Sequence, residues 1–206
     1  LKKIIKNKKI FQDPYGGMGD VWATVQKSLD SGSPFFSTHM LRENTQRQIV
    51  ELFSIVENKS LFPQFVPLLP NYKKYMVQYY QKSYYPTKTK WSKTNENIIT
   101  YQIISPNAHC LPQKILDKYS LIKWELFKQK HPTFHFIELG KNYSFQQIVD
   151  FMSRSKFFFG IDSGMSHLAH SVGVPTFLWG WSRIEFFHPK KIYNTIQDIN
   201  QLEEFI

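Results

Sequence analysis

The chain has 206 residues, of which 42% are hydrophobic and 17% are aromatic, so it can bury the core of one large domain or two small ones. This composition excludes an intrinsically disordered chain, and no apolar run reaches the roughly 20 residues that a membrane-spanning helix needs. The single cysteine, Cys110, excludes an internal disulfide framework and fits a reducing compartment. Because no signal segment opens the sequence, we expect a cytoplasmic protein.

The chain is strongly basic, with 26 Lys and Arg against 16 Asp and Glu and a formal net charge of +10. Such a balance favours an anionic partner, such as a nucleotide, a phosphorylated glycan or a nucleic acid. A lysine-rich solvated surface without any such partner explains the charge equally well, and the sequence leaves both interpretations open.

The first half of the chain mixes short apolar runs with turns. Hydrophobic periodicity predicts strands over 9–13, 33–38 and 74–81, and helices over 20–29 and 42–58. The stretch 82–97 is polar, basic and poor in aliphatic residues, and we interpret it as a linker between two domains.

After the linker, strands and helices alternate regularly. The pattern predicts strands over 98–105, 133–139, 156–161 and 175–180, and helices over 112–129, 144–155, 163–173 and 198–206. Alternation of this kind predicts an α/β fold with a parallel sheet covered by helices on both faces.

The strand at 156–161 is followed by the small polar cluster DSGMSH, residues 162–167. Ligands of parallel sheets bind at the carboxyl ends of the strands, where helix N-termini present free amide groups and a positive dipole end. Gly164 lets a ligand approach the backbone, and Ser166 can add a hydroxyl, so the cluster can form a phosphate cradle. The alternative is an ordinary helix cap built from Asp162 or Ser163.

A second glycine-rich turn, GGMGD at 16–20, follows the strand at 9–13. It matches neither the dinucleotide fingerprint nor the P-loop. Asp20 stands at the mouth of the next helix, where a carboxylate can act as a general base or simply cap the helix.

Together the two segments resemble bacterial heptosyltransferases and their relatives, glycosyltransferase family nine. GGMGDVWATVQ is similar to the N-terminal motif of the family, and FFFGIDSGMSHLAHSVGVPTFLWG (157–180) is similar to its C-terminal signature. The resemblance covers residues 98–181, with an island at 10–26.

The resemblance implies a GT-B-like α/β fold, in which two Rossmann-like parallel-sheet domains face each other across a cleft. Residues 1–90 would form a reduced acceptor-side domain, and 91–206 would bind a nucleotide-sugar. The implied function is transfer of a sugar from a nucleotide-diphosphate sugar to an acceptor hydroxyl of a glycan, a lipopolysaccharide-like molecule or a DNA base. The nucleotide-sugar is a co-substrate, and neither a cofactor nor a metal is expected.

Site residues follow by position. Asp20 is the implied catalytic base, beside a glycine loop formed by Gly16, Gly17, Met18 and Gly19. The implied donor site comprises Asp162, Ser163, Gly164, Met165, Ser166 and His167, with Glu138 toward a ribose and Lys114 toward a phosphate. The sequence departs from the family pattern where Asn107 replaces a glycine and Lys114 is displaced by about one position.

A non-catalytic module that binds a nucleotide-sugar or nucleic acid is the main alternative. The linker interleaves Tyr84, Tyr85 and Trp91 with lysines, a combination that can stack bases and follow phosphates. A serine hydrolase is disfavoured, since GMSHL lacks the second glycine of a nucleophile elbow.

Overall fold

The structure is a computed structural model. It describes the backbone of 11–13 and 35–37, the positions Glu51, Ser54 and Ile55, and the ranges 87–93, 95–104, 116–140, 142–180 and 194–206. The first two ranges form strands β1 (Phe11–Asp13) and β2 (Phe35–Ser37), which pair in parallel. Both lie within strands expected from the sequence.

The second half of the chain forms a five-stranded, wholly parallel sheet in the order β4-β3-β5-β6-β7. Its strands are β3 (Ile98–Gln102), β4 (His135–Glu138), β5 (Phe158–Gly160), β6 (Thr176–Trp179) and β7 (Asn194–Ile196). The predicted α/β class with a parallel sheet is therefore confirmed.

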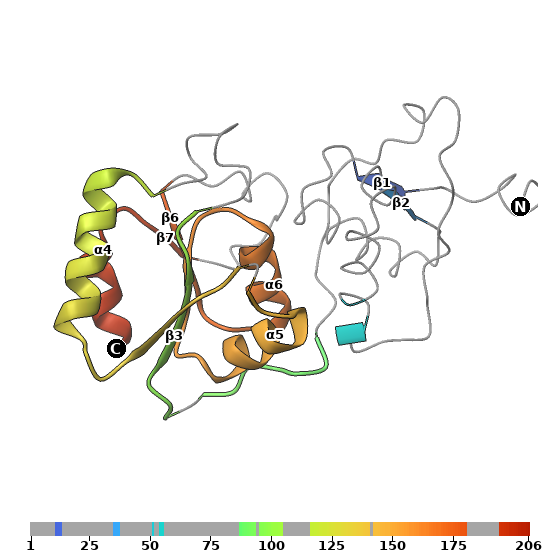
Figure 1. Cartoon of the computed structure of the whole chain (residues 1–206), viewed down its shortest axis with the longest axis horizontal. Coiled ribbons are helices and arrows are strands. Elements are labelled where there is room, and N and C mark those ends of the chain that lie inside the picture. The colour runs from blue at the N-terminus through green and yellow to red at the C-terminus, as the bar shows by residue number, and fades with distance from the viewer. Residues whose placement is uncertain are drawn as a thin grey trace, which may run out of the picture.

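Helices cover both faces of this sheet (Figure 1). One face carries α4 (Lys118–Lys130) and the 3₁₀ helix η5 (Ile199–Phe205), which contact each other. The other face carries α5 (Phe145–Arg154) and α6 (Gly164–Val172). The result is a three-layer, doubly wound arrangement.

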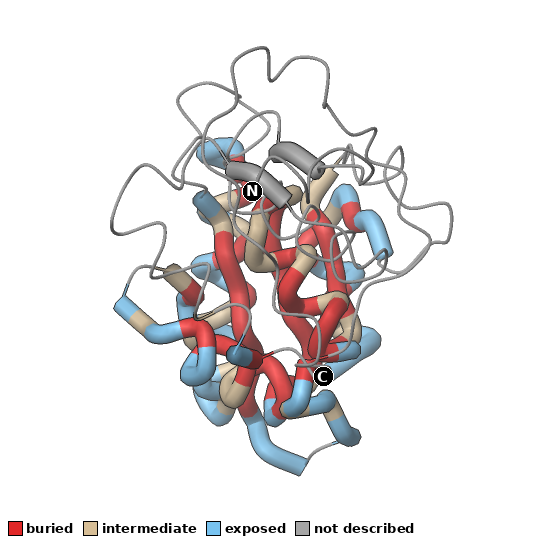
Figure 2. The backbone as a smooth tube through the Cα atoms, turned by 90° about the vertical axis from the view of Figure 1, so that its right-hand side faces the viewer, coloured by how far each residue is buried: buried red, intermediate tan, exposed pale blue. Residues whose placement is uncertain are grey.

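Strand β3 shows how the sequence produces these layers. All five of its residues are buried, as expected for a strand covered on both faces. Ile99 and Tyr101 belong to the α4-side core, where Trp124 is fully buried among the rings of Tyr101, Phe127, Phe136 and Phe159. Thr100 and Gln102 alternate with them and therefore face α5 and α6. In Figure 2 buried positions run through the middle of this unit and exposed positions lie on its outer turns and helix surfaces.

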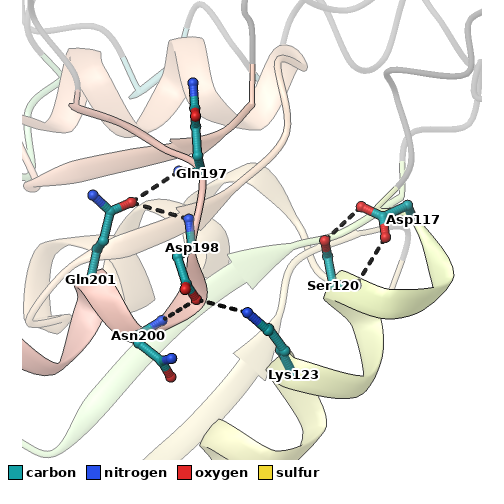
Figure 3. Close-up of polar contacts among 7 residues, drawn as sticks. All are labelled: Asp117, Ser120, Lys123, Gln197, Asp198, Asn200 and Gln201. Atoms are coloured by element: carbon teal, nitrogen blue, oxygen red, sulfur yellow. Dashed lines mark hydrogen bonds and ion pairs between the residues drawn. The ribbon is translucent and has the colours of Figure 1, made fainter.

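Helix α4 begins later than the periodicity predicts. Leu116 and Asp117 are not helical, so the predicted start at 112 is wrong. The Asp117 carboxylate accepts hydrogen bonds from the backbone N–H and the hydroxyl of Ser120, which fixes Lys118 as the first helical residue (Figure 3).

The closing segment also differs from expectation. Residues 199–205 form the closing helix predicted over 198–206, as a 3₁₀ helix, and strand β7 before it was not predicted. Asp198 caps η5 through the Asn200 N–H and also meets the Lys123 ammonium group of α4 at 3.3 Å (Figure 3). This ion pair ties the two helices on that face together.

Part of the predicted linker packs on the α5–α6 side. The Thr87 and Trp91 amides donate to the carbonyls of Ser171 and Val172 at the end of α6. Glu51, from the first half of the chain, accepts a hydrogen bond from the Phe145 amide at the start of α5 (2.8 Å). The linker is thus joined to the second half by the hydrogen bonds that the Thr87 and Trp91 amides donate to the end of α6.

Candidate functional site

The candidate site lies where β3 and β5 run side by side. The chain leaves β3 toward α4 on one face of the sheet and leaves β5 toward α6 on the other face. Ligands of doubly wound sheets bind at such a switch point, beyond the carboxyl ends of the strands. The cluster 162–167 begins directly after β5, so it occupies this place.

A close approach of the two strands shapes the switch point. Gln102 of β3 pairs with Gly160 of β5, and the Gln102 carbonyl accepts the Ile161 amide at 3.1 Å. A Cβ atom on Gly160 would lie 2.6 Å from the Gln102 carbonyl oxygen and 2.9 Å from the Phe158 ring. Glycine is therefore required at 160 by space and not by an unusual backbone angle.

The cluster after β5 is a capped helix start. Ser163 is the N-cap of α6, and its hydroxyl accepts the Met165 amide at 3.3 Å. The Ser166 hydroxyl accepts the Ser163 amide at 3.1 Å and donates to the Ser163 carbonyl at 2.7 Å. This reciprocal capping box holds the first turn of α6 in a single geometry.

One further hydrogen bond links this cap to β3. The Ser163 hydroxyl donates to Gln102 Oε1 at 2.5 Å, in a buried position. Both serine hydroxyls of the cluster are therefore engaged within the protein, and Ser163 and Ser166 are themselves buried. The Ser163 and Met165 amides are also engaged in the cap, so the anion-binding features of the cluster are the Gly164 amide and the positive end of the α6 dipole.

The other predicted residues of the cluster lie nearer the surface. Asp162, Gly164, Met165 and His167 are half-buried. His167 is followed one turn later by His170, whose pKa falls to about 4 because the ring is buried and because His167 lies nearby. His170 is thus neutral at physiological pH. It lies in the last turn of α6.

Glu138 is the last residue of β4 and is exposed. Strand β3 lies between β4 and β5, the strand that leads into the cluster. It is the register partner of Tyr101. Burial raises the pKa of the Tyr101 phenol, Lys128 opposes this shift, and the Glu138 carboxylate reinforces it. Glu138 therefore stands at the carboxyl edge beside the α4 layer, while Ser163 and Ser166 belong to the α6 layer.

The remaining predicted residues lie outside the described part of the chain. They are the base and its loop (Gly16, Gly17, Met18, Gly19 and Asp20) and the displaced Lys114. The proposed domain boundary between 90 and 91 is likewise a prediction that the structure does not test.

Trp91, which the sequence offers for base stacking, makes a hydrogen bond within the protein, and the stacking role stays a prediction. Its indole Nε1 donates to the Ser155 carbonyl at 2.8 Å, and the side chain is half-buried. The ring is therefore held against the α5–α6 side by its own polar atom.

Gln102 is the residue of this site that sequence reasoning missed. It lies within an apolar strand pattern, and its partner Ser163 is 61 residues away, so no local signal marks it.

Neither a metal cluster nor a membrane-spanning helix is present among the described residues. Among them, no three His, Cys, Asp or Glu side chains gather in a way that could hold a metal ion. None of the helices in the described ranges is both long and apolar enough to cross a bilayer.

Comparison with known proteins finds likeness in structure only. No protein-family model matches the sequence, and no curated protein matches it. Among solved structures, the chain resembles the iron-containing dodecameric heptosyltransferase TibC in complex with ADP-D-β-D-heptose, with 11% identity and a TM-score of 0.53 over 85% of this chain and 59% of that one. It also resembles the iron-containing dodecameric glycosyltransferase TibC from enterotoxigenic E. coli H10407, with 12% identity and a TM-score of 0.54 over 84% of this chain and 59% of that one.

This likeness defines the class of fold. The chain has an α/β fold similar to that of glycosyltransferases of the GT-B type, which confirms the predicted fold class. It spans about 59% of the length of the TibC chain. Membership of family nine is a finer statement, and it stays a prediction.

Proposed function

We propose that the chain is a glycosyltransferase, which moves a sugar from a nucleotide-diphosphate sugar to an acceptor hydroxyl. The observation that carries the proposal is the capped N-terminus of α6 at the β3–β5 switch point, within a fold shared with sugar-transferring enzymes. TibC holds ADP-D-β-D-heptose in one of its structures, which supports a nucleotide-sugar as the donor class.

In the proposed reaction the acceptor oxygen attacks the anomeric carbon of the donor sugar. The new C–O bond forms as the bond from the anomeric carbon to the diphosphate breaks, and the diphosphate oxygen keeps the electron pair. Asp20 would take the hydroxyl proton as general base. The α6 amides and dipole would stabilise the negative charge on the departing nucleoside diphosphate.

The proposed reaction requires no metal, because the helix N-terminus supplies the positive potential that the leaving group needs. TibC is iron-containing, so elemental analysis of the purified chain belongs in the test. Transfer that stops on treatment with a chelator, and returns with iron, would contradict metal independence.

The first experiment is a thermal-shift screen against ADP, GDP, UDP, CMP and dTDP and their common sugars, with a short DNA duplex as an additional ligand. A ligand at one hundred times its dissociation constant stabilises the native state by about 2.7 kcal/mol. We expect one nucleotide family to raise the melting temperature. Stabilisation by DNA alone would favour the nucleic-acid binding module, and no stabilisation by any nucleotide would refute the donor site.

Two variants separate binding from transfer. Gly164→Val should abolish the nucleotide-induced shift because its side chain crowds the phosphate position. Valine has a higher helix propensity than glycine, so loss of the helix is not the expected cause. Asp20→Asn should retain the shift and lose transfer. Transfer by Asp20→Asn at the wild-type rate would assign Asp20 a capping role.

A non-catalytic nucleotide-sugar module is the second candidate. It rests on the same switch-point site, because the capped start of α6 could bind a diphosphate whether or not transfer follows. A stable nucleotide complex without transfer or donor hydrolysis would support this candidate.

A further inference from the structure

We propose that Gln102 is a positioning residue of the donor site, which fixes the α6 cap in the orientation that a diphosphate requires. The inference rests on the proposed function, because it concerns the same switch-point site. Gln102 would act through Ser163 and not through its own contact with the substrate.

The first support is the double attachment of Gln102 to the loop after β5. Its backbone carbonyl accepts the Ile161 amide, and its side-chain Oε1 accepts the Ser163 hydroxyl. Two contacts from one residue therefore span the three-residue stretch between β5 and α6. Gly160 permits this approach, since any side chain there would meet the Gln102 carbonyl.

The second support is the direction of the hydrogen bonds. The single proton of the Ser163 hydroxyl goes to Gln102, so the oxygen lone pairs stay available for the Met165 amide. Without an acceptor at 102, this hydroxyl would be free to rotate. Gln102 thus fixes the direction of the Ser163 O–H bond, and with it the orientation of the cap.

The third support is burial. Gln102 is 6% exposed and Ser163 is 9% exposed. A buried hydroxyl that loses its acceptor is left unsatisfied, which is costly in a low-dielectric setting. The first turn of α6 would then shift to recover a partner, and the Gly164 amide and the dipole end that would face the diphosphate would move with it.

The test compares the wild-type protein with Gln102→Met, which keeps the length of the side chain and removes the acceptor. The control is Thr176→Val, which removes a buried hydrogen bond to the Val174 carbonyl. Thr176 begins β6, so it lies at the amino ends of the strands, opposite to the carboxyl ends where the site lies. The probes are ADP, GDP and UDP, each paired with its monophosphate and titrated by calorimetry.

We expect Gln102→Met to weaken binding of the diphosphate by about tenfold to a hundredfold, as for one or two lost hydrogen bonds to a charged group, and to weaken the monophosphate less. Thr176→Val should lower the melting temperature and leave both affinities unchanged. Amide hydrogen exchange at 164–166 should accelerate in Gln102→Met and not in the control.

A cycle with Ser163→Ala tests the route of the effect. If Gln102 acts through the Ser163 hydroxyl, the double variant should bind the diphosphate no more weakly than the weaker of the two single variants. Additive losses would overturn the proposed route.

The outcomes separate this inference from the proposed function. Wild-type protein that binds a nucleoside diphosphate, together with Gln102→Met that binds it equally well, would overturn the inference alone. Wild-type protein that binds none of the three diphosphates, and is stabilised by neither CMP nor dTDP in the thermal-shift screen, would overturn the donor site and the role of Gln102 in it, whatever the exchange data show.

Discussion

Replacing Gly160 with alanine tests the geometry of the switch point most directly. The added Cβ would lie 2.6 Å from the Gln102 carbonyl oxygen, and that oxygen already accepts the Ile161 amide. A backbone oxygen in a paired strand cannot rotate away, so β3 and β5 must separate locally. The second close atom, at 2.9 Å, belongs to the Phe158 ring, which is itself fully buried.

The expected cost of Gly160→Ala follows from two opposing effects. Overpacking of a buried site costs about 1–3 kcal/mol, and a backbone partner places this site at the upper end. Replacing a glycine in a strand stabilises the folded state by roughly 0.5–1 kcal/mol, because alanine loses less conformational entropy on folding. The net loss is therefore about 2 kcal/mol, which lowers the melting temperature by roughly 4–8 °C in a chain of this size.

The assay is thermal and urea denaturation of Gly160→Ala beside Gly140→Ala. At Gly140 an added Cβ meets no atom within 4 Å, and the residue is not among those with positive φ. Gly140→Ala should therefore be neutral or stabilising by up to about 1 kcal/mol. Equal melting temperatures for the two variants would refute the close approach of β3 and β5.

Two further predictions concern α6. Burial lowers the pKa of His170 to about 4, against about 6.5 in the unfolded chain. Between these pH values the unfolded state binds more protons than the folded state. The free energy of unfolding should therefore fall as the pH drops from about 6.5 to 4, by roughly 3 kcal/mol in total. His170→Gln should flatten this part of the stability profile in urea titrations, and an unchanged profile would place the histidine in water. Gly173 ends α6 with φ of +88° and open space around it, so Gly173→Ala should cost about 1–2 kcal/mol from backbone strain alone, whereas Gly173→Asn should cost less. Equal denaturation midpoints for these two variants would argue against a left-handed cap.

The sequence predicted the layers of the second half well where its strands are largely apolar and buried, as in β3, β5 and β6. Strand β5 is an example, since Phe157, Phe158 and Phe159 can be buried together only in a strand covered on both faces. The N-terminus of α6 was also predicted, because Ser163 and Gly164 directly follow that run. Local pattern and tertiary structure agree at these places.

The misses have specific physical causes. Strand β7 has two exposed residues, Asn194 and Thr195, and one buried residue, Ile196, so it lacks a readable alternation. The start of α4 was placed too early because apolar spacing continues upstream of Asp117. Asp117 can be identified as the N-cap that sets the start of α4 only once its hydrogen bond from the Ser120 amide is known.

The site shows a different limit of sequence reasoning. The residue types at 162–167 indicated a phosphate cradle, and hydroxyls counted there as candidate ligand donors. In the structure the protons of both hydroxyls are used internally, one toward Gln102 and the other toward the Ser163 carbonyl. A sequence lists the polar groups of a loop, but only the fold shows which of them are already engaged.

This engagement also bears on what the site can recognise. With both serine protons committed and the Ser163 and Met165 amides held in the cap, the helix start offers an incoming ligand the Gly164 amide and the positive end of a dipole. Such features select negative charge and are indifferent to the arrangement of sugar hydroxyls. If the proposed function holds, discrimination among donor sugars would come from other groups at the carboxyl edge. The half-buried Asp162 and the exposed Glu138 carry carboxylates that can accept hydrogen bonds from hydroxyls. The diphosphate and the sugar would thus contact different parts of one edge of the sheet, which is why Gln102→Met should weaken the nucleoside diphosphate that the wild-type protein binds and its sugar conjugates alike.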